Sequence, residues 1–191
     1  TPGLGLMAGA EYHLATYGLW GYALLTCPNF GEAVHMGLRY LDLSFAFSRI
    51  DLDERSDSVA IVLNVDHLPP AARAFVLERD SSAIQVIQRE LFGAAMPLMD
   101  LEFSMRPTAP VAQYEAVYGR VPRFESSRNA VVFSRDLLST PLPKGNPASV
   151  EYFDRQLQQL LQLRTERGGT SAWIRNKLLA NISNTPGLAQ I

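Results

Sequence analysis

One run of alternating residues constrains the fold of this chain more than any other feature. From Val59 to Val65 every second residue is Val, Ile or Leu, and a period of two is typical of a β-strand. Ala60 and Val62 add apolar character to the opposite face. We therefore expect a central strand that is buried on both sides, which requires neighbouring strands and a covering layer.

Other stretches supply those neighbours. Ser44–Leu52 has strand character, and the polar turn Asp53–Asp57 joins it to the central strand as a hairpin. Met99–Met105 alternates again. Phe124 and Ala130–Phe133 predict a further strand pair or one long bent strand.

Helices are predicted between and after the strands. Asn29 followed by Glu32 is a good helix start, and Asn146-Pro147 is another. The opening segment, Leu4–Leu19, has no clean period. The predicted helices cover Phe30–Leu43, the stretch from Pro70 to Gly93, Val111–Tyr118, Asn146–Arg167, and a last one that begins at Thr170. This order predicts an α+β fold with a mixed or antiparallel sheet, packed helices and a long C-terminal helix.

Size and charge exclude several classes of protein. The chain has 191 residues, which suits one domain of ordinary size. Its net charge of −2 gives no general attraction to nucleic acid or to anionic lipid. No stretch reaches the ~18 apolar residues of a membrane span. Cys27 is the only cysteine, so we expect no internal disulfide, a reducing compartment and a cytoplasmic protein.

Residues for catalysis or metal binding do not form a recognisable pattern. His13, His35 and His67 have no helical i, i+4 spacing, and the chain has no Gly-x-Ser-x-Gly elbow. We therefore predict no catalytic residues, no metal site and no cofactor, and a binding or sensing module in place of an enzyme. A small hydrolase that uses His67 or Cys27 is the enzymatic alternative.

Two pairs of carboxylates lie on strand-like segments. Asp51 and Asp53 form one pair, and Asp100 and Glu102 form the other. Side chains two residues apart on a strand share a face, which permits acid–base chemistry. Because both pairs adjoin turns, we expect a solvated sheet edge.

Several motifs occur together in an order that resembles one protein family. Leu19–Ala33 is similar to the "LGLLGYALLSSPTLGEAL" core of a group of AraC/XylS-type transcriptional regulators, and Leu38-Arg39-Tyr40 to the "RY" that follows it. Leu101–Gly119 resembles that group's "F…PAP…Y…FG" passage, and Asn129–Pro143 its closing segment. The resemblance covers most of the chain.

The resemblance implies a function and a division of the chain. Residues 1–167 would be the effector-binding and dimerisation domain of a regulator related to those that respond to ornithine, arginine and similar metabolites. Residues 168–191 would be a hinge and the first helix of a truncated helix-turn-helix domain. DNA binding would then belong to a missing C-terminal part, and the chain would be a fragment of a longer regulator. The expected partners are a small-molecule effector, an amino acid or related metabolite, and a second copy in a homodimer, with no membrane.

Polar and aromatic residues near these motifs are the candidates for the ligand site. Arg39 and Arg106 could pair with an effector carboxylate, and Glu102 could receive an ammonium group. The alternatives are that Arg39 is a surface residue and that Glu102 and Arg106 lie on the wet face of a sheet. The predicted ligand-binding residues are Tyr22, Arg39, Tyr40, Glu102, Ser104, Arg106 and Tyr114.

The helix from Asn146 to Arg167 is the candidate dimer or relay element, because its apolar stripe is narrow and flanked by glutamines. The alternative is a helix packed only on its own domain. The predicted dimer or relay residues are Phe153, Leu157, Leu160 and Leu161. The leading interpretation is thus the sensing module of a regulator, and a dimerisation scaffold without ligand is the second.

Overall fold

The computed structural model describes residues 2–180, with side chains up to residue 164. Its sheet contains four antiparallel strands in the order β1-β2-β4-β3. The strands are β1 (Arg49–Glu54), β2 (Ser58–Asn64), β3 (Asp100–Glu102) and β4 (Ala130–Ser134). Helices precede, interrupt and follow these strands, so the predicted α+β class is confirmed, with a purely antiparallel sheet.

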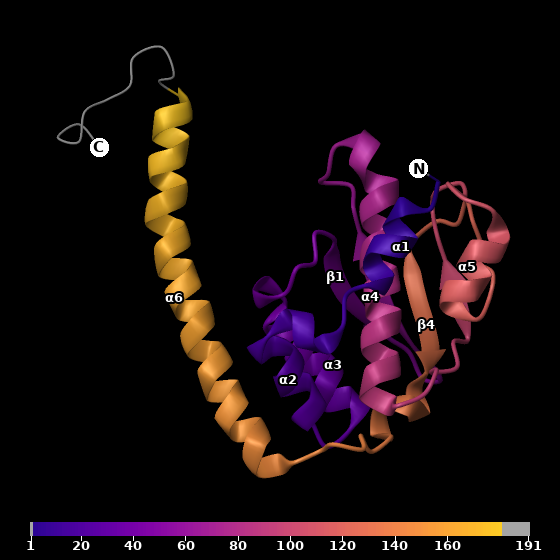
Figure 1. Ribbon diagram of the computed structural model, residues 1–191, viewed down its shortest axis with the longest axis horizontal. Helices are drawn as coiled ribbons and strands as arrows, with labels where there is room; N and C mark the ends of the chain where they lie inside the picture. The colour runs from indigo at the N-terminus through magenta and orange to yellow at the C-terminus, as the bar shows by residue number, and fades with distance from the viewer. Residues whose placement is uncertain (1, 181–191) are drawn as a thin grey trace.

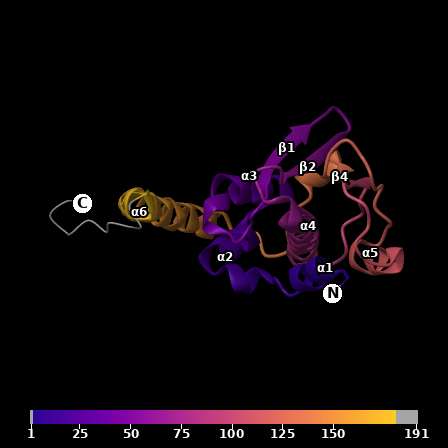
Figure 2. The ribbon, with the colours of Figure 1, turned by 90° about the horizontal axis from the view of Figure 1, so that it is seen from above.

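The alternating run forms the inner strand β2, as predicted. It pairs with β1 through Leu52 opposite Ile61, and with β4 through Ile61 opposite Val131. Val59 and Leu63 face the main core and are buried. Ala60 is buried on the opposite face, whereas Val62 is half-buried there. The described helices gather on one side of the sheet (Figure 2), so the other face depends on cover from side chains.

The central helix α4 (Pro70–Phe92) lies against the core face of the sheet (Figure 1). It starts at Pro70 and stops just before Gly93, close to the limits that the sequence predicted. Gly93 is the C-cap, and its φ of 72° is left-handed. The short helix α1 (Leu4–Ala10) crosses it at very close range. A Cβ atom at Gly9 would lie 2.2 Å from the carbonyl oxygen of Arg79. Close helix packing thus requires glycine in the segment that showed no helical period.

Two further helices line the domain beside α4. Helix α2 (Leu19–Thr26) leads into α3 (Phe30–Arg39), whose N-cap is Asn29 as predicted. The Asn29 side chain accepts a hydrogen bond of 2.9 Å from the backbone of Glu32. The sequence predicted that this helix continues to Leu43. It ends at Arg39, and a short 3-10 helix, η2 (Leu41–Leu43), follows.

The predicted strand limits were too generous in two places, because side chains take the backbone hydrogen bonds there. Strand β1 starts at Arg49 and not at Ser44, since the backbone amides of Phe47 and Ser48 donate to the carboxylate of Asp80 on α4. Strand β3 ends at Glu102, since the amide of Ser104 donates to the side chain of Asn129. Phe124, predicted as part of a strand, lies in a loop.

Two helices complete the chain. Helix α5 (Val111–Tyr118) has the predicted bounds, and its C-cap Gly119 has a left-handed φ of 71°. Helix α6 (Pro147–Ala180) begins after Asn146, whose side chain accepts from the amide of Ser149. It continues through residues 168–169, where the sequence predicted a hinge, and extends away from the domain in Figure 1. The domain division at residue 167 stays a prediction, and residues 181–191 of the predicted second part lie outside the described residues. Across the described part of the chain, no helix is long and apolar enough to cross a membrane.

Candidate functional site

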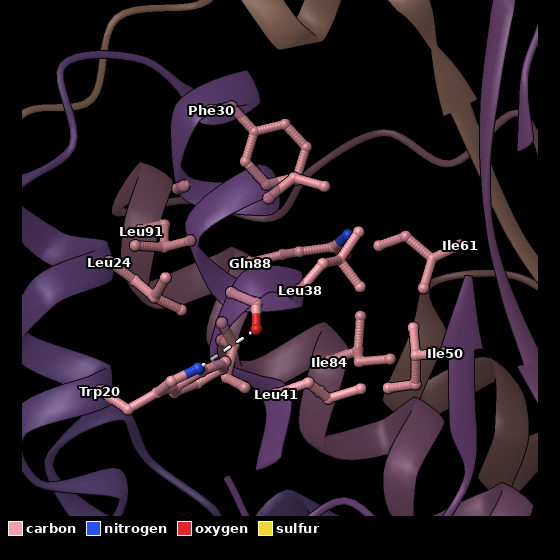
Figure 3. Close-up of a pocket in the computed structure, with 14 residues that line it drawn as sticks. Trp20, Leu24, Phe30, Leu38, Leu41, Ile50, Ile61, Ile84, Gln88 and Leu91 are labelled. Carbon is pink, nitrogen blue, oxygen red and sulfur yellow. Dashed lines mark hydrogen bonds between the residues drawn. The ribbon is translucent and has the colours of Figure 1, made fainter. Parts of the chain in front are cut away.

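An apolar cavity of about 80 Å³ lies between the helices and the sheet. Trp20 and Leu24 of α2 line one side, and Ile50 of β1 and Ile61 of β2 line the opposite side (Figure 3). Helix α3 contributes a wall of Phe30, Ala33, Val34, Gly37 and Leu38. The only polar group among these side chains is the indole N–H of Trp20. It donates to the carbonyl of Gly37 at 3.3 Å.

Gln88 of α4 is the one polar side chain in this wall that lacks a hydrogen-bond partner. It is 2% exposed, and neither its amide nitrogen nor its amide oxygen has a partner. Ile84 and Leu91, one turn to either side, line the same cavity. Figure 3 shows the amide reaching into the space enclosed by the apolar side chains. Since buried polar groups are nearly always hydrogen-bonded, this amide marks the cavity as a place for a polar partner.

Sequence reasoning did not single out Gln88, although a signal was available. The helical stripe of Ile84, Ile87 and Leu91 is apolar, and Gln88 falls within it. A polar residue inside an apolar stripe must either find a partner or face a cavity. The sequence shows the stripe, but only the fold shows the cavity.

A smaller cavity of about 40 Å³ adjoins the first. Trp20, Leu41, Ile50, Ile84 and Ile87 line both cavities. The smaller one also reaches a carboxylate, that of Asp80. Its oxygen Oδ2 already accepts the amide protons of Phe47 and Ser48 and the hydroxyl of Ser48, at 2.6–2.9 Å.

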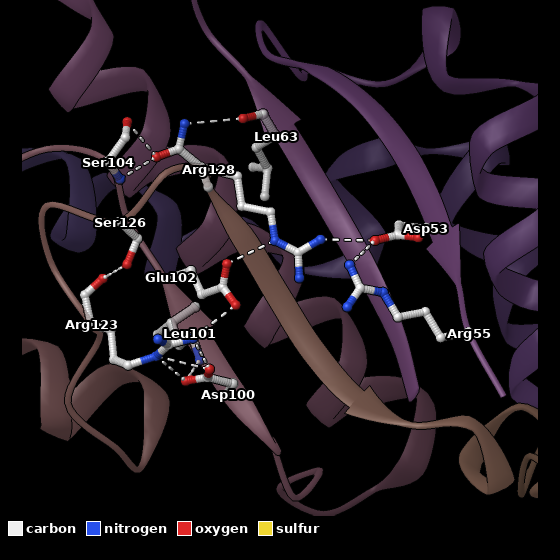
Figure 4. Close-up of polar contacts among 11 residues, drawn as sticks. Asp53, Arg55, Leu63, Asp100, Leu101, Glu102, Ser104, Arg123, Ser126 and Arg128 are labelled. Atoms are coloured by element: carbon white, nitrogen blue, oxygen red, sulfur yellow. Dashed lines mark hydrogen bonds and ion pairs between the residues drawn. The ribbon is translucent and has the colours of Figure 1, made fainter. Parts of the chain in front are cut away.

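A network of charges covers the other face of the sheet (Figure 4). Arg128 crosses this face and donates to Glu102 at 2.7 Å and to Asp53 at 2.8 Å. Arg123 pairs with Glu102 at 2.9 Å and also with Asp100. Because each carboxylate faces a guanidinium group, the network is neutralised from within and covers Ala60 and Ala130 below it. Glu102 thus lies on the polar face that the alternative interpretation predicted.

These contacts shift the ionisation of the carboxylates. The hydrogen bond from Arg128 is the main cause that lowers the pKa of Asp53 below its ordinary 3.8. Burial raises the pKa of Asp100, but hydrogen bonds from Arg123 and from the amide of Leu101 outweigh it, so the pKa falls. Carboxylates held in the charged form are unsuited to general acid–base work near neutral pH.

The structure does not bring the seven predicted ligand-binding residues together. None of them lines the apolar cavity, and Arg39 alone lines a larger, open groove between α3 and α6. Tyr22 is 52% exposed on α2. Ser104 donates to Asn129 at 2.9 Å, and Arg106 pairs with Glu125 at 2.9 Å on the surface. The buried hydroxyl of Tyr114 donates to Glu78. The polar groups of Ser104, Arg106 and Tyr114 are thus already paired within the protein, and their partners come from distant parts of the sequence.

Arg39 and Tyr40 do meet, at a place that the sequence did not indicate. Both donate to the carboxylate of Asp154 on α6, at 3.1 Å and 2.9 Å. Burial, followed by this hydrogen bond, raises the pKa of Tyr40. Farther along α6, Arg164 donates to the carbonyl of Asp42. Helix α6 is therefore attached to α3 and η2, the segment that forms one wall of the cavity.

The four predicted dimer or relay residues separate into two groups. Leu157 is fully buried, and Phe153 and Leu161 pack against the main core. Leu160 is 42% exposed. The same helix also exposes Tyr152 and Leu163. Helix α6 thus packs on its own domain along one stripe, as the alternative interpretation expected, and leaves a second apolar stripe exposed.

Other candidates for chemistry are occupied in structural roles. Cys27 is fully buried, as a small core residue would be, and burial raises the pKa of its thiol to about 12. His67 contacts the carbonyl of Phe47, and His13 pairs with Glu90. Within the described residues, no three His, Cys, Asp or Glu side chains form a group that could hold a metal ion.

Comparisons with known proteins give this architecture a family. Residues 1–142 match the model of the arabinose-binding domain of AraC transcription regulators, at their N-terminus. An uncharacterised HTH-type transcriptional regulator of Mycobacterium tuberculosis is 27% identical over 99% of this chain and 56% of its own length. The ornithine utilization regulator of Pseudomonas aeruginosa is 28% identical over 99% of this chain and 56% of its own length. The chain thus spans about half the length of these relatives.

A solved structure has the same fold. The transcriptional regulator CdpR from Pseudomonas aeruginosa superposes with a TM-score of 0.66 at 23% identity, over 80% of this chain and 50% of that one. The family and these relatives are transcriptional regulators and not enzymes. The chain therefore belongs to the family of AraC-type transcription regulators and forms their N-terminal domain.

Proposed function

We propose that this chain is the effector-sensing and dimerisation module of a cytoplasmic bacterial regulator, whose DNA contacts are made by a C-terminal helix-turn-helix domain. The observation that carries the proposal is the apolar cavity with the unpartnered amide of Gln88 in its wall. Ligand sites typically combine apolar walls with a few fixed polar groups.

The attachment of α6 supplies a route from this cavity to the rest of a regulator. Phe30 and Leu38 of α3 line the cavity, while Arg39 and Tyr40 at the end of the same helix hold Asp154 of α6. A ligand that favours one position of α3 therefore favours one position of α6. If the ligand and DNA each bind one position of α6 more tightly than another, the binding of the ligand changes the affinity for DNA. This linkage is the proposed coupling between the two sites.

The test is a thermal-shift screen of amino acids, polyamines, fatty acids and small uncharged amides and alcohols against the whole chain and its Ile84→Phe variant. Ile84 lines both cavities, and a larger phenyl ring there obstructs them. A ligand at ten times its Kd raises stability by about 1.4 kcal/mol, so we expect some compounds to raise the wild-type midpoint by several degrees and the variant's midpoint not at all.

Val111→Phe is the matched control, since it adds a phenyl ring to an exposed site on α5. Each midpoint is compared with that of the same variant without ligand, because overpacking lowers stability by ~1–3 kcal/mol. If no compound raises the wild-type midpoint, or if Ile84→Phe retains the full shift, the sensing function in this cavity is refuted. The first of these outcomes favours a dimerisation scaffold without ligand.

A further inference from the structure

The chemistry of the cavity wall also restricts its ligand. We infer that the effector is a small, uncharged and mainly apolar molecule. It carries one polar group that donates a hydrogen bond to the amide oxygen of Gln88 and accepts one from the amide nitrogen. This inference rests on the proposed sensing function and names the ligand class for the same site. It differs from the amino acid that the family resemblance implies.

No side chain that lines the main cavity carries a charge. The nearest carboxylate, Asp80, belongs to the smaller cavity and already accepts hydrogen bonds from Phe47 and Ser48. Arg79 lies outside both walls, with its guanidinium 4.9 Å from the ring centre of Tyr12 and 3.2 Å from the Asp80 carboxylate. An ammonium or carboxylate group beside the buried amide of Gln88 would therefore lack a counter-charge, which costs far more than one hydrogen bond returns.

The polar part of the ligand is defined by what Gln88 lacks. Both the oxygen and the nitrogen of its amide are unpartnered. The amide can thus accept one hydrogen bond and donate others. A carboxamide or a hydroxyl group can satisfy both needs, whereas a hydrocarbon of the same shape leaves the amide unpaired.

The apolar part of the ligand is limited by size and shape. The main cavity is about 80 Å³, roughly half the ~150 Å³ of an apolar cavity that binds benzene. A branched chain of a few carbons fits this space. Displacement of Ile84 and Ile87, which separate it from the adjoining cavity, makes room for one ring.

Two matched sets of probes test the inference. Isobutyramide, isobutyrate and isobutylamine share one apolar skeleton, and benzamide, benzoate and benzylamine share another. At pH 7 the amides are neutral, the acids are anions and the amines are cations. Calorimetry with the whole chain should detect binding of at least one amide. We expect its affinity to exceed that of the matched anion and cation by at least tenfold.

Gln88→Leu is the decisive variant, because leucine keeps the volume and removes both polar atoms. It should weaken amide binding about tenfold, the value of one hydrogen bond. Gln85→Leu is the matched control, since Gln85 is equally buried on α4 and has an unpartnered oxygen, but does not line either cavity. It should leave amide binding unchanged. Circular dichroism verifies that both variants fold.

Three results overturn the inference. One is an anion or cation that binds as tightly as its amide, another is Gln88→Leu with affinity within twofold of wild type, and the third is no binding of either amide. If an amino acid instead binds and Ile84→Phe abolishes its binding, the inference falls while the sensing function stands. If no compound of any class binds, both fall together.

Discussion

Individual residues in this domain hold unusual chemical states that can be measured directly. Cys27 is the only cysteine of the chain and is fully buried, with a thiol pKa of about 12. At pH 8 only about one thiol in ten thousand is then ionised. We expect Ellman's reagent to label the native protein at least a hundredfold more slowly than the protein in urea. Comparable rates would show that the thiol is accessible in the native state.

Asp100 provides a test of the charge network by pH. Its pKa in the folded state is lower than the ordinary 3.8, so the network stabilises the fold above that pH and the contribution is lost as the pH falls through the folded-state pKa. We expect the urea midpoint of the wild type to fall more steeply between pH 5 and pH 3 than that of Asp100→Asn. Asp51→Asn, on an exposed residue of the same face, is the control. Equal slopes for wild type and Asp100→Asn would contradict the assignment.

At the scale of single residues, the sequence predicted helix limits well and the contact partners of charged side chains poorly. The helix start at Asn29 and the helix limits at Gly93 and Tyr118 were predicted, because they depend on local chemistry. Glu102 and Arg106 were chosen for a ligand because they are charged residues near the family motifs. Their partners Arg128 and Glu125 lie 19 or more positions away, and only the fold brings them close.

Among the elements, the contact between α1 and α4 depends on the absence of side chains. A Cβ atom at Gly9 would come within 2.2 Å of the Arg79 carbonyl. Gly9→Ala should therefore force the helices apart and lower the free energy of unfolding by at least ~3 kcal/mol. Gly93→Ala, at a left-handed position with open space around it, should cost only ~1 kcal/mol. Urea unfolding measures both, and equal losses would refute the close packing.

The contact between α3 and α6 can also be tested by a substitution. Tyr40→Phe removes the hydroxyl that donates to Asp154 at 2.9 Å, at a cost of about 1 kcal/mol. We expect hydrogen exchange to become faster in the first turns of α6 and to stay unchanged in α4. Tyr22→Phe, on an exposed tyrosine, should have no effect. Unchanged exchange in α6 with Tyr40→Phe would remove this contact from the proposed relay.

The elements themselves were predicted where one period dominates. Strand β2 and helices α4 and α5 follow their patterns closely. Helices α1 and α2 were not predicted, because glycines needed for close packing, such as Gly9 and Gly21, interrupt their apolar periods. The main cavity could not be predicted at all, since its walls come from separate elements that meet only after folding.

At the scale of the whole molecule, the exposed stripe on α6 is the proposed dimer surface. Tyr152, Leu160 and Leu163 point away from the stripe that packs on the domain. Leu160→Glu with Leu163→Glu should shift the protein from dimer to monomer in analytical ultracentrifugation. Gln158→Glu with Gln162→Glu adds the same charge at exposed positions farther round the helix and should leave the dimer intact. A double leucine variant that remains dimeric would place the interface elsewhere.

Because α6 is one continuous helix, a small tilt at its attached end causes a larger displacement at its far end. From Arg164, which still donates to the carbonyl of Asp42, to Ala180 the helix rises ~24 Å at ~1.5 Å per residue. A tilt of ~8° at this attached end then displaces the far end by ~3.4 Å, the length of one base-pair step. In the proposed regulator, a small tilt of α6 at its attachment would thus displace the tip of the helix by about one base-pair step.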